Sequence, residues 1–234
     1  MLRGLLSILI LGGSSYAVEA RCVDPATLTQ STVSIMRYFQ DEDKAPGVIG
    51  IRGTAWFLSP TSMVTVEHVA ASMHLSDQSW KEVVIEQGEH VRSIPARIQQ
   101  VTGSSSTERI AVIELQTAFA GAQSLDLRME PLVSEEPVVS LGYPGGHLRV
   151  AAGRFVQYGD GARLEGTALF EIYDRDDRLA LDHGASGAPV LDCEGHVVAV
   201  VSNLLVTTLQ FFSRQIRVPT AWGIPTWSAC LFPC

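Results

Sequence analysis

Residues 182–202 read DHGASGAPVLDCEGHVVAVVS, a glycine-rich turn followed by apolar runs. Ser186 lies inside the turn, between Gly184 and Gly187, and Pro189 follows it. Glycine and proline are typical of a tight turn before a strand, which is the plain structural interpretation. The same setting suits a nucleophilic hydroxyl, because nearby backbone N–H groups can stabilise the oxyanion that forms when a serine attacks a carbonyl.

A second, mostly apolar stretch contains a histidine. Residues 53–71 read GTAWFLSPTSMVTVEHVAA. His68 follows the run MVTV and precedes small residues that favour a turn. A single histidine is more often structural than catalytic. Combined with Ser186 further along the chain, however, His68 forms a candidate pair of general base and nucleophile.

The rest of the chain has the pattern of short strands separated by turn residues. Apolar and polar residues alternate in residues 31–39, and a second run occupies residues 48–60. Further runs of the same style lie at residues 63–66, 82–86, 94–101, 110–115, 138–141, 149–158, 168–173, 188–192 and 197–201. Helical patterning is limited to residues 69–73, and no βαβ alternation occurs. The pattern predicts an all-β sandwich or barrel.

The composition is that of a folded chain with a large core. The 234 residues are 46% hydrophobic and 18% charged, which excludes a disordered chain. Lys and Arg number 17 against 25 Asp and Glu, so the net charge is −8. Because no basic run interrupts this acidic background, nucleic acid is not an expected partner.

Residues 1–20, MLRGLLSILILGGSSYAVEA, have the layout of a secretory signal peptide. A positive charge at Arg3 precedes a short apolar stretch, and small residues follow it. The stretch is too short for a spanning helix, and no later segment is long enough, so no stable membrane insertion is expected after signal cleavage. The sequence therefore predicts a secreted or periplasmic protein, and it leaves the oligomeric state open.

Four cysteines follow the predicted signal peptide, namely Cys22, Cys193, Cys230 and Cys234. An even number in an exported chain suggests disulfide bonds, which would attach a cysteine-containing tail at residues 216–234 to the body of the protein. Three pairings are possible, and free buried thiols are the alternative. A metal site is not expected, because no second close Cys or His pair completes a zinc ligand set.

The serine and histidine segments together resemble those of the trypsin-like serine peptidases. That family carries its serine in G-x-S-G-x-P, matched here by GASGAP, and its histidine in T-A-A-H, where this chain has TVEH. The segments VVSLGYPGG and CEGHVVAVVS also resemble bacterial HtrA-type peptidases. The resemblance covers residues 33–202 and implies two six-stranded antiparallel β-barrels, at residues 21–128 and 129–215, with the active site in the cleft between them.

The resemblance also implies a role for each site residue. Ser186 would be the nucleophile, His68 the general base, and the backbone amides of Gly184 and Ser186 the oxyanion hole. Ala180 and Ser202 would line the substrate pocket and favour small or medium apolar side chains. Polypeptides would be the substrates, and no metal or organic cofactor is expected.

The chain departs from the family pattern at the third catalytic residue. The family has an Asp directly before the strand motif I-A-V-x-x-L, but here Arg109 precedes IAVIEL and Glu108 lies one position earlier. A shift of one residue in an extended segment turns the side chain to the opposite face. Three hypotheses stay open: Glu108 orients the imidazole, another acid such as Asp77 does so, or a His–Ser pair acts without an acid.

The main prediction is therefore an exported serine endopeptidase. The alternative is a peptidase-fold protein that has lost cleavage and binds peptides or proteins, and Arg109 and Glu67 are the residues that favour it. A secreted β-sandwich adhesin or carbohydrate-binding module would explain the strands and cysteines, but not the co-occurrence of GASGAP and VEHVA.

Overall fold

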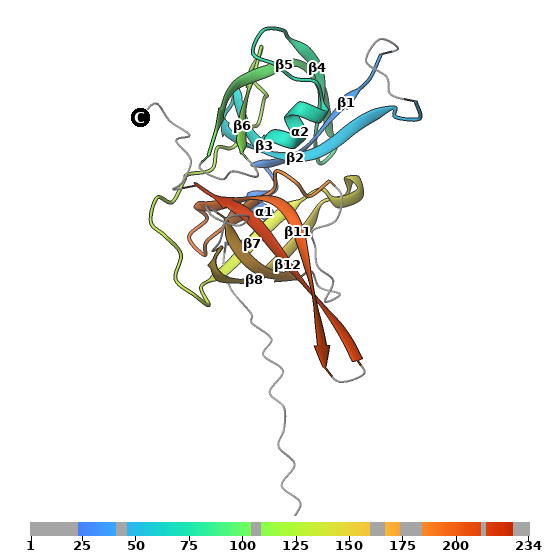
Figure 1. Ribbon diagram of the computed structural model, residues 1–234. Helices are drawn as coiled ribbons and strands as arrows, with labels where there is room; N and C mark the ends of the chain where they lie inside the picture. The colour runs from blue at the N-terminus through green and yellow to red at the C-terminus, as the bar shows by residue number, and fades with distance from the viewer. Residues whose placement is uncertain are drawn as a thin grey trace, which may run out of the picture.

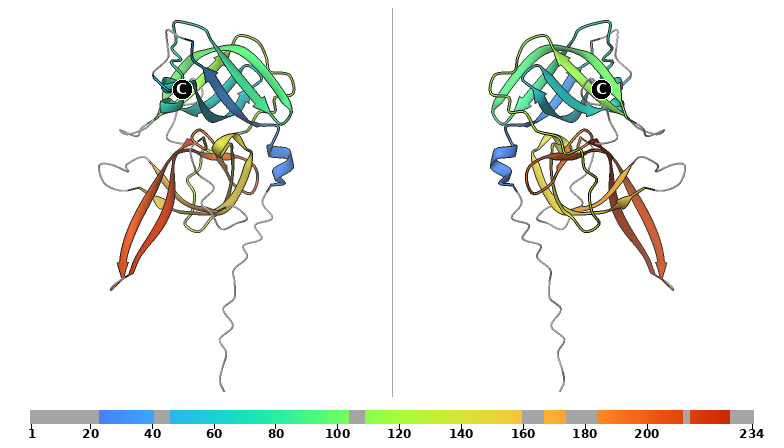
Figure 2. Two further views of the ribbon diagram at one scale, coloured as in Figure 1. Left: turned by 90° about the vertical axis from the view of Figure 1, so that its right-hand side faces the viewer. Right: turned by 90° about the vertical axis from the view of Figure 1, so that its left-hand side faces the viewer.

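The computed structural model describes residues 23–40, 46–103, 109–159, 167–173, 184–211 and 214–226. These residues form two closed six-stranded antiparallel β-barrels, one from each half of the chain (Figure 1). Perpendicular views show the barrels stacked one above the other (Figure 2). The architecture is chymotrypsin-like, so the predicted all-β fold with two barrels is confirmed.

The first barrel has the strand order β1-β2-β3-β6-β5-β4, and pairing of β1 with β4 closes it. In chain order its strands are β1 (Thr32–Tyr38), β2 (Gly50–Ser59), β3 (Ser62–Val66), β4 (Lys81–Gln87), β5 (His90–Thr102) and β6 (Ile110–Leu115). A short helix, α1 (Pro25–Leu28), precedes β1, and a second, α2 (Glu67–Ser72), directly follows β3. The helical patterning expected at residues 69–73 thus corresponds to α2.

The second barrel has the strand order β10-β11-β12-β9-β8-β7, and pairing of β10 with β7 closes it. In chain order its strands are β7 (Pro137–Gly142), β8 (Arg149–Tyr158), β9 (Ala168–Tyr173), β10 (Pro189–Leu191), β11 (Val197–Phe211) and β12 (Arg214–Pro225). A single 3₁₀ turn, η1 (Pro144–Gly146), follows β7.

The hairpin of β11 and β12 is longer than the sequence pattern predicted. The apolar run at residues 197–201 indicated a short strand, but β11 continues to Phe211. Of β12, only residues 221–223 pair with β9, and among the described residues the outer part of the hairpin pairs only within itself. It extends away from the barrel in Figure 1. The segment from residue 216, expected to be a separate tail, begins inside β12.

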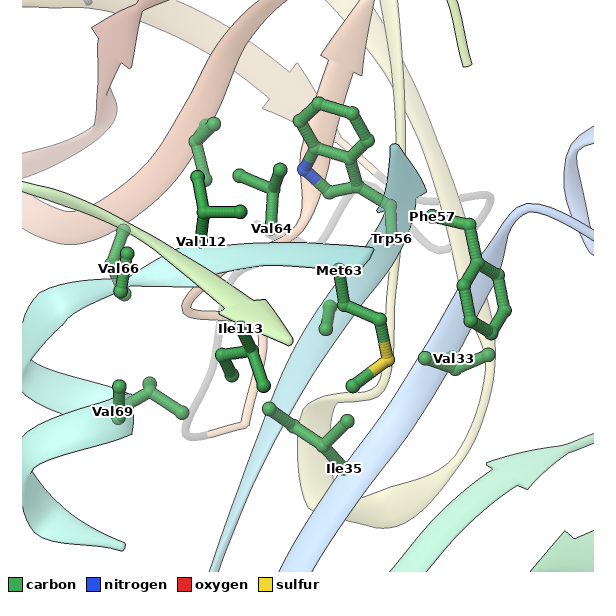
Figure 3. Close-up of a cluster of buried hydrophobic side chains, with 14 of the residues drawn as sticks. Val33, Ile35, Trp56, Phe57, Met63, Val64, Val66, Val69, Val112 and Ile113 are labelled. Carbon is green, nitrogen blue, oxygen red and sulfur yellow. The ribbon is translucent and has the colours of Figure 1, made fainter. Parts of the chain in front are cut away.

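The apolar core of the first barrel draws large side chains from both faces of its strands. Phe57, Met63 and Ile113 are fully buried, and so is Trp56, which lies with Val64 on the opposite face of β2 and β3 (Figure 3). The ring of Phe57 also stacks on Phe119, with 5.3 Å between the ring centroids. The cluster continues into the second barrel through Val139, Leu141, Leu191, Val197, Val200 and Ile224. The two barrels are therefore joined by continuous apolar packing.

Strand β1 is buried on both faces, because the second barrel and one arginine cover its polar side. Ile35 belongs to the core, whereas Ser34 accepts a hydrogen bond of 3.1 Å from Arg52. The backbone carbonyl of Thr32 accepts one of 3.4 Å from the hydroxyl of Tyr143, in the turn after β7. Thr32 thus belongs to the interface between the barrels, whereas Ser34 is covered by Arg52 of the same barrel.

The connection between the barrels lies against β11. The Val197 N–H donates to the carbonyl of Asp126 at 2.8 Å, and the Arg128 N–H donates to the carbonyl of Val197 at 3.0 Å. The guanidinium of Arg128 is hydrogen-bonded to Glu136, which raises the pKa of Arg128, and it also faces the buried Asp192. The domain boundary expected between residues 128 and 129 falls inside this connection.

Cys193 takes part in a disulfide bond. Cys22, Cys230 and Cys234 all lie outside the described residues, so the pairing stays a prediction. The predicted signal peptide at residues 1–20 lies outside them as well. Among the helices that the structure describes, none has the length and apolar character needed to cross a bilayer.

Candidate active site

The loop that carries Ser186, between β9 and β10, depends on two glycines. The φ angle is +102° at Gly184 and +94° at Gly187, a region that residues with a side chain rarely adopt. A Cβ on Gly187 would lie 2.0 Å from the carbonyl oxygen of Thr54, and one on Gly184 would lie 2.7 Å from that of Tyr143. The turn therefore rests directly on neighbouring backbone, and both the conformation and the space require glycine.

Ser186 is partly exposed and attached to both barrels. Its backbone carbonyl accepts a hydrogen bond of 3.0 Å from the N–H of Thr54 in β2. Its hydroxyl donates to the backbone carbonyl of Ser202 in β11, also at 3.0 Å. The next residue, Gly187, donates its N–H to the carbonyl of Val201 at 2.8 Å. The predicted nucleophile thus lies in a rigidly anchored turn where the barrels meet.

His68 is the second residue of α2 and is partly buried. The adjacent Val69 and Ala70 are buried and attach the helix to the barrel. Gly53 in β2 permits this close packing, because a Cβ there would lie 2.5 Å from Cγ1 of Val69. Figure 3 shows Val69 beside the core residues of β3 and β6, among them Ile113. The packing of Val69 against β2 therefore sets the position of the first turn of α2, which carries His68.

The serine loop and the start of the histidine helix are attached to the same point of the first barrel. Thr54 is hydrogen-bonded to the carbonyl of Ser186 by its N–H and to that of Gly184 by its hydroxyl, at 2.7 Å. The carbonyl of Thr54 in turn accepts a bond of 2.7 Å from the hydroxyl of Thr65, three residues before His68. The fold thus brings the two predicted residues to the same end of the β2–β3 pair.

The two departures from the family pattern contact each other. Arg109 donates from Nε and Nη2 to the two carboxylate oxygens of Glu67, at 2.8 and 2.5 Å. The backbone N–H of Glu67 also donates to the carbonyl of Arg109 at 2.8 Å. Both side chains are partly exposed, with 51% of Arg109 and 29% of Glu67 accessible to solvent. An arginine before β6 and a glutamate before His68 therefore form one ion pair that joins β6 to α2.

Only some of the remaining predicted site residues lie in the part of the chain that the structure describes. Glu108 and Ala180 lie outside the described residues, so their roles stay predictions. Asp77 is an exposed residue between α2 and β4. Ser202 is buried, and its hydroxyl has no hydrogen-bond partner among the residues that the structure describes. Within that same part of the chain, no group of three or more His, Cys, Asp or Glu side chains could hold a metal ion.

Sequence reasoning missed three residues that fix the site. Thr54 and Thr65 lie inside the quoted histidine segment, and Tyr143 lies in VVSLGYPGG, but nothing in their local pattern distinguishes them from ordinary strand and turn residues. The N–H of Tyr143 donates to the Thr54 hydroxyl at 2.9 Å. Burial raises the pKa of the Tyr143 hydroxyl, which the second barrel places against β1.

Comparisons with known proteins agree with this geometry. A search of curated proteins found no match. Among solved structures, the chain is similar to Rv3671c protease from M. tuberculosis in its active form, with 20% identity, a TM-score of 0.57, and coverage of 87% of this chain and 79% of that one. The inactive form of Rv3671c protease gives 19% identity, a TM-score of 0.57, and coverage of 87% of both chains.

An inactive serine-to-alanine mutant of Rv3671c from M. tuberculosis H37Rv gives 20% identity and a TM-score of 0.54, with 87% of this chain and 84% of that one covered. These similarities show the fold. A family model, described as the trypsin-like peptidase domain, matches residues 53–200, which include both the histidine and the serine segments. The chain belongs to the family of trypsin-like peptidase domains.

Proposed function

We propose that the chain is an exported serine endopeptidase in which Ser186 is the nucleophile and His68 the general base and acid. The backbone amides of Gly184 and Ser186 form the oxyanion hole. One observation supports this proposal most strongly: Thr54 is hydrogen-bonded to both segments. Its N–H and hydroxyl donate to carbonyl groups of the Ser186 loop, and its own carbonyl accepts a hydrogen bond from Thr65, three residues before His68. Two segments far apart in the chain are thereby held at one place.

The proposed reaction begins with a change of partner for the Ser186 hydroxyl. The hydroxyl now donates to the carbonyl of Ser202 and has to exchange it for the imidazole of His68. Oγ then attacks the peptide carbonyl while His68 takes the proton, and the amides stabilise the resulting oxyanion. The C–N bond breaks as His68 returns the proton to the leaving amine. Water, activated in the same way, hydrolyses the acyl-enzyme and regenerates Ser186.

The third residue of the proposed mechanism is Glu108. An acid beside the imidazole selects its tautomer and stabilises the imidazolium, and its loss slows catalysis without abolishing it. Glu67, directly before His68 in the chain, is already engaged by Arg109 through both carboxylate oxygens. Glu108→Gln tests this role, because unchanged turnover would remove Glu108 from the mechanism and leave another acid such as Asp77, or a His–Ser pair.

Labelling by a fluorophosphonate tests the nucleophile directly. The purified mature chain is expected to react stoichiometrically at Ser186 and to cleave unfolded casein, and Ser186→Ala should lose both. Ser134→Ala is a matched control, since Ser134 is an exposed serine whose hydroxyl also donates to a backbone carbonyl, that of Val156 at 3.0 Å. A folded protein that shows neither activity at any pH from about 6 to 9, where a histidine base can be neutral, contradicts the proposal.

A second candidate function is binding without cleavage. The ion pair of Arg109 and Glu67 favours it, because a cation stands where the family has its acid. This function predicts that peptides bind the cleft while Ser186 does not react with a fluorophosphonate. The labelling experiment therefore separates the two candidates.

Export and substrate preference complete the proposal. The peptidase domain implies polypeptide substrates, and Ala180 and Ser202 as pocket residues favour small or medium apolar side chains. Cleavage after a signal peptide at residues 1–20 is tested by N-terminal sequencing of the protein recovered from a secreting host. Disulfide attachment of the residue 216–234 segment is tested by peptide mapping with and without reductant. Recovery of Met1 in the mature protein contradicts export with cleavage.

A further inference from the structure

Thr54 joins the two barrels beside Ser186. It is a fully buried residue of β2 and takes part in four hydrogen bonds outside the sheet ladders. Two of them reach the serine loop: the Thr54 N–H donates to the carbonyl of Ser186 at 3.0 Å, and its hydroxyl donates to that of Gly184 at 2.7 Å. One residue of the first barrel thus holds two carbonyl groups of the second.

The two anchored carbonyls flank the amide of Ser186. That N–H belongs to the peptide between Ala185 and Ser186, whereas the anchored carbonyls of Gly184 and Ser186 belong to the peptides before and after it. Because both neighbouring peptides are fixed, the amide between them has little freedom to rotate. A donor stabilises developing negative charge best when it is oriented before the reaction begins.

The hydroxyl of Thr54 is itself fixed by a third group. It accepts a hydrogen bond of 2.9 Å from the N–H of Tyr143 while it donates to the carbonyl of Gly184. The Tyr143 carbonyl lies so close to Gly184 that a Cβ there would approach it to 2.7 Å. Valine at position 54 has the same shape as threonine, but it would leave the Tyr143 N–H and the Gly184 carbonyl without this partner.

We infer that Thr54 is a positioning residue of the proposed active site, which orients the Ser186 amide for the oxyanion. The inference rests on the proposed peptidase function. Thr54 belongs to the first barrel, whereas Ser186 belongs to the second. The orientation of the Ser186 amide, and with it the rate of catalysis, then depends on contact between the barrels through the Thr54 hydroxyl.

Thr54→Val tests this role. We expect the kcat for a chromogenic peptide and the rate of fluorophosphonate labelling to fall by about tenfold or more, because removal of an oxyanion donor lowers kcat strongly. KM should change by less than about twofold, since the lost interaction acts mainly in the transition state. Thr54→Ser keeps the hydroxyl and should retain both rates within about twofold of the wild type.

Ser140→Ala provides a matched control. Ser140 is a buried residue of β7 whose hydroxyl donates to the carbonyl of Pro189 at 2.8 Å, so the substitution removes the same type of bond three residues beyond Ser186. Loss of this bond leaves the peptides around Ser186 anchored. We therefore expect labelling and kcat close to those of the wild type.

Wild-type kcat and labelling in a folded Thr54→Val variant overturn the inference. If this variant does not fold, amide hydrogen exchange of the wild-type protein decides. The Tyr143 amide should be strongly protected, and exchange as fast as that of an exposed amide contradicts the link to Thr54. If the wild type itself is not labelled, the proposed function fails. If the wild type and Thr54→Val are labelled equally, only the role of Thr54 fails.

Discussion

Gly53→Ala tests whether close packing of α2 against β2 positions His68. The added Cβ would lie 2.5 Å from Cγ1 and 3.2 Å from Cγ2 of Val69, whereas carbon atoms prefer about 3.5–4.0 Å. Valine in a helix strongly prefers one rotamer, so the side chain has little room to turn away. The first turn of α2 must therefore move by roughly 1 Å, and His68 moves with it.

The expected size of the effect follows from this overlap. Overpacking costs about 1–3 kcal/mol, and the loss of glycine from a strand offsets about 0.4–1 kcal/mol of it because the unfolded chain loses freedom. The net loss in the free energy of unfolding is then about 0–2.6 kcal/mol. A displacement of about 1 Å at a catalytic group costs about 100-fold in rate, so activity should fall far more than stability.

Denaturant unfolding measures the first effect, and the rate of fluorophosphonate labelling at Ser186 measures the second. Val69→Ala removes both methyl groups that the new Cβ meets, so the double variant should recover labelling relative to Gly53→Ala alone. Val69→Ala by itself serves as the control for the lost core contact. Wild-type stability together with wild-type labelling in Gly53→Ala would refute the idea that this packing holds His68.

Two further predictions concern charge. A double-mutant cycle on Glu67 and Arg109 should give a coupling energy of only about 0.2–1 kcal/mol that salt weakens, because both side chains are partly exposed. The ion pair of Arg97 and Glu114 is the matched control. If fluorophosphonate labelling of Ser186 falls only when Glu67 or Arg109 is changed, the first pair has a role beside His68. Burial raises the pKa of the Tyr143 hydroxyl above its ordinary 10.0. The neutral hydroxyl therefore contributes to the free energy of unfolding below pH 10, and this contribution is lost as the pH rises through the raised pKa. Tyr143→Phe should flatten this alkaline loss in a pH series of unfolding, and an unchanged slope contradicts the assignment.

Much of the secondary structure was predictable from local patterns. Alternation and turn residues placed the strands at residues 110–115, 149–158 and 168–173 at the bounds that the structure shows. The outer part of β11 and all of β12 were missed. The two strands pair with each other from Ala199 and Pro225 out to Phe211 and Arg214, so this hairpin depends on a partner strand and not on a local pattern of apolar residues.

The sequence by itself determined most of the strands, the two glycines around Ser186, and the resemblance of the serine and histidine segments to a known family. These features depend on short stretches of chain, where steric limits and side-chain alternation act locally. The tertiary structure alone decided which residues meet. The Thr54 hydroxyl contacts Gly184 across 130 positions of sequence, and Arg109 contacts Glu67 across 42. Such contacts arise from closing and docking the barrels, and no local pattern encodes the identity of a distant hydrogen-bond partner.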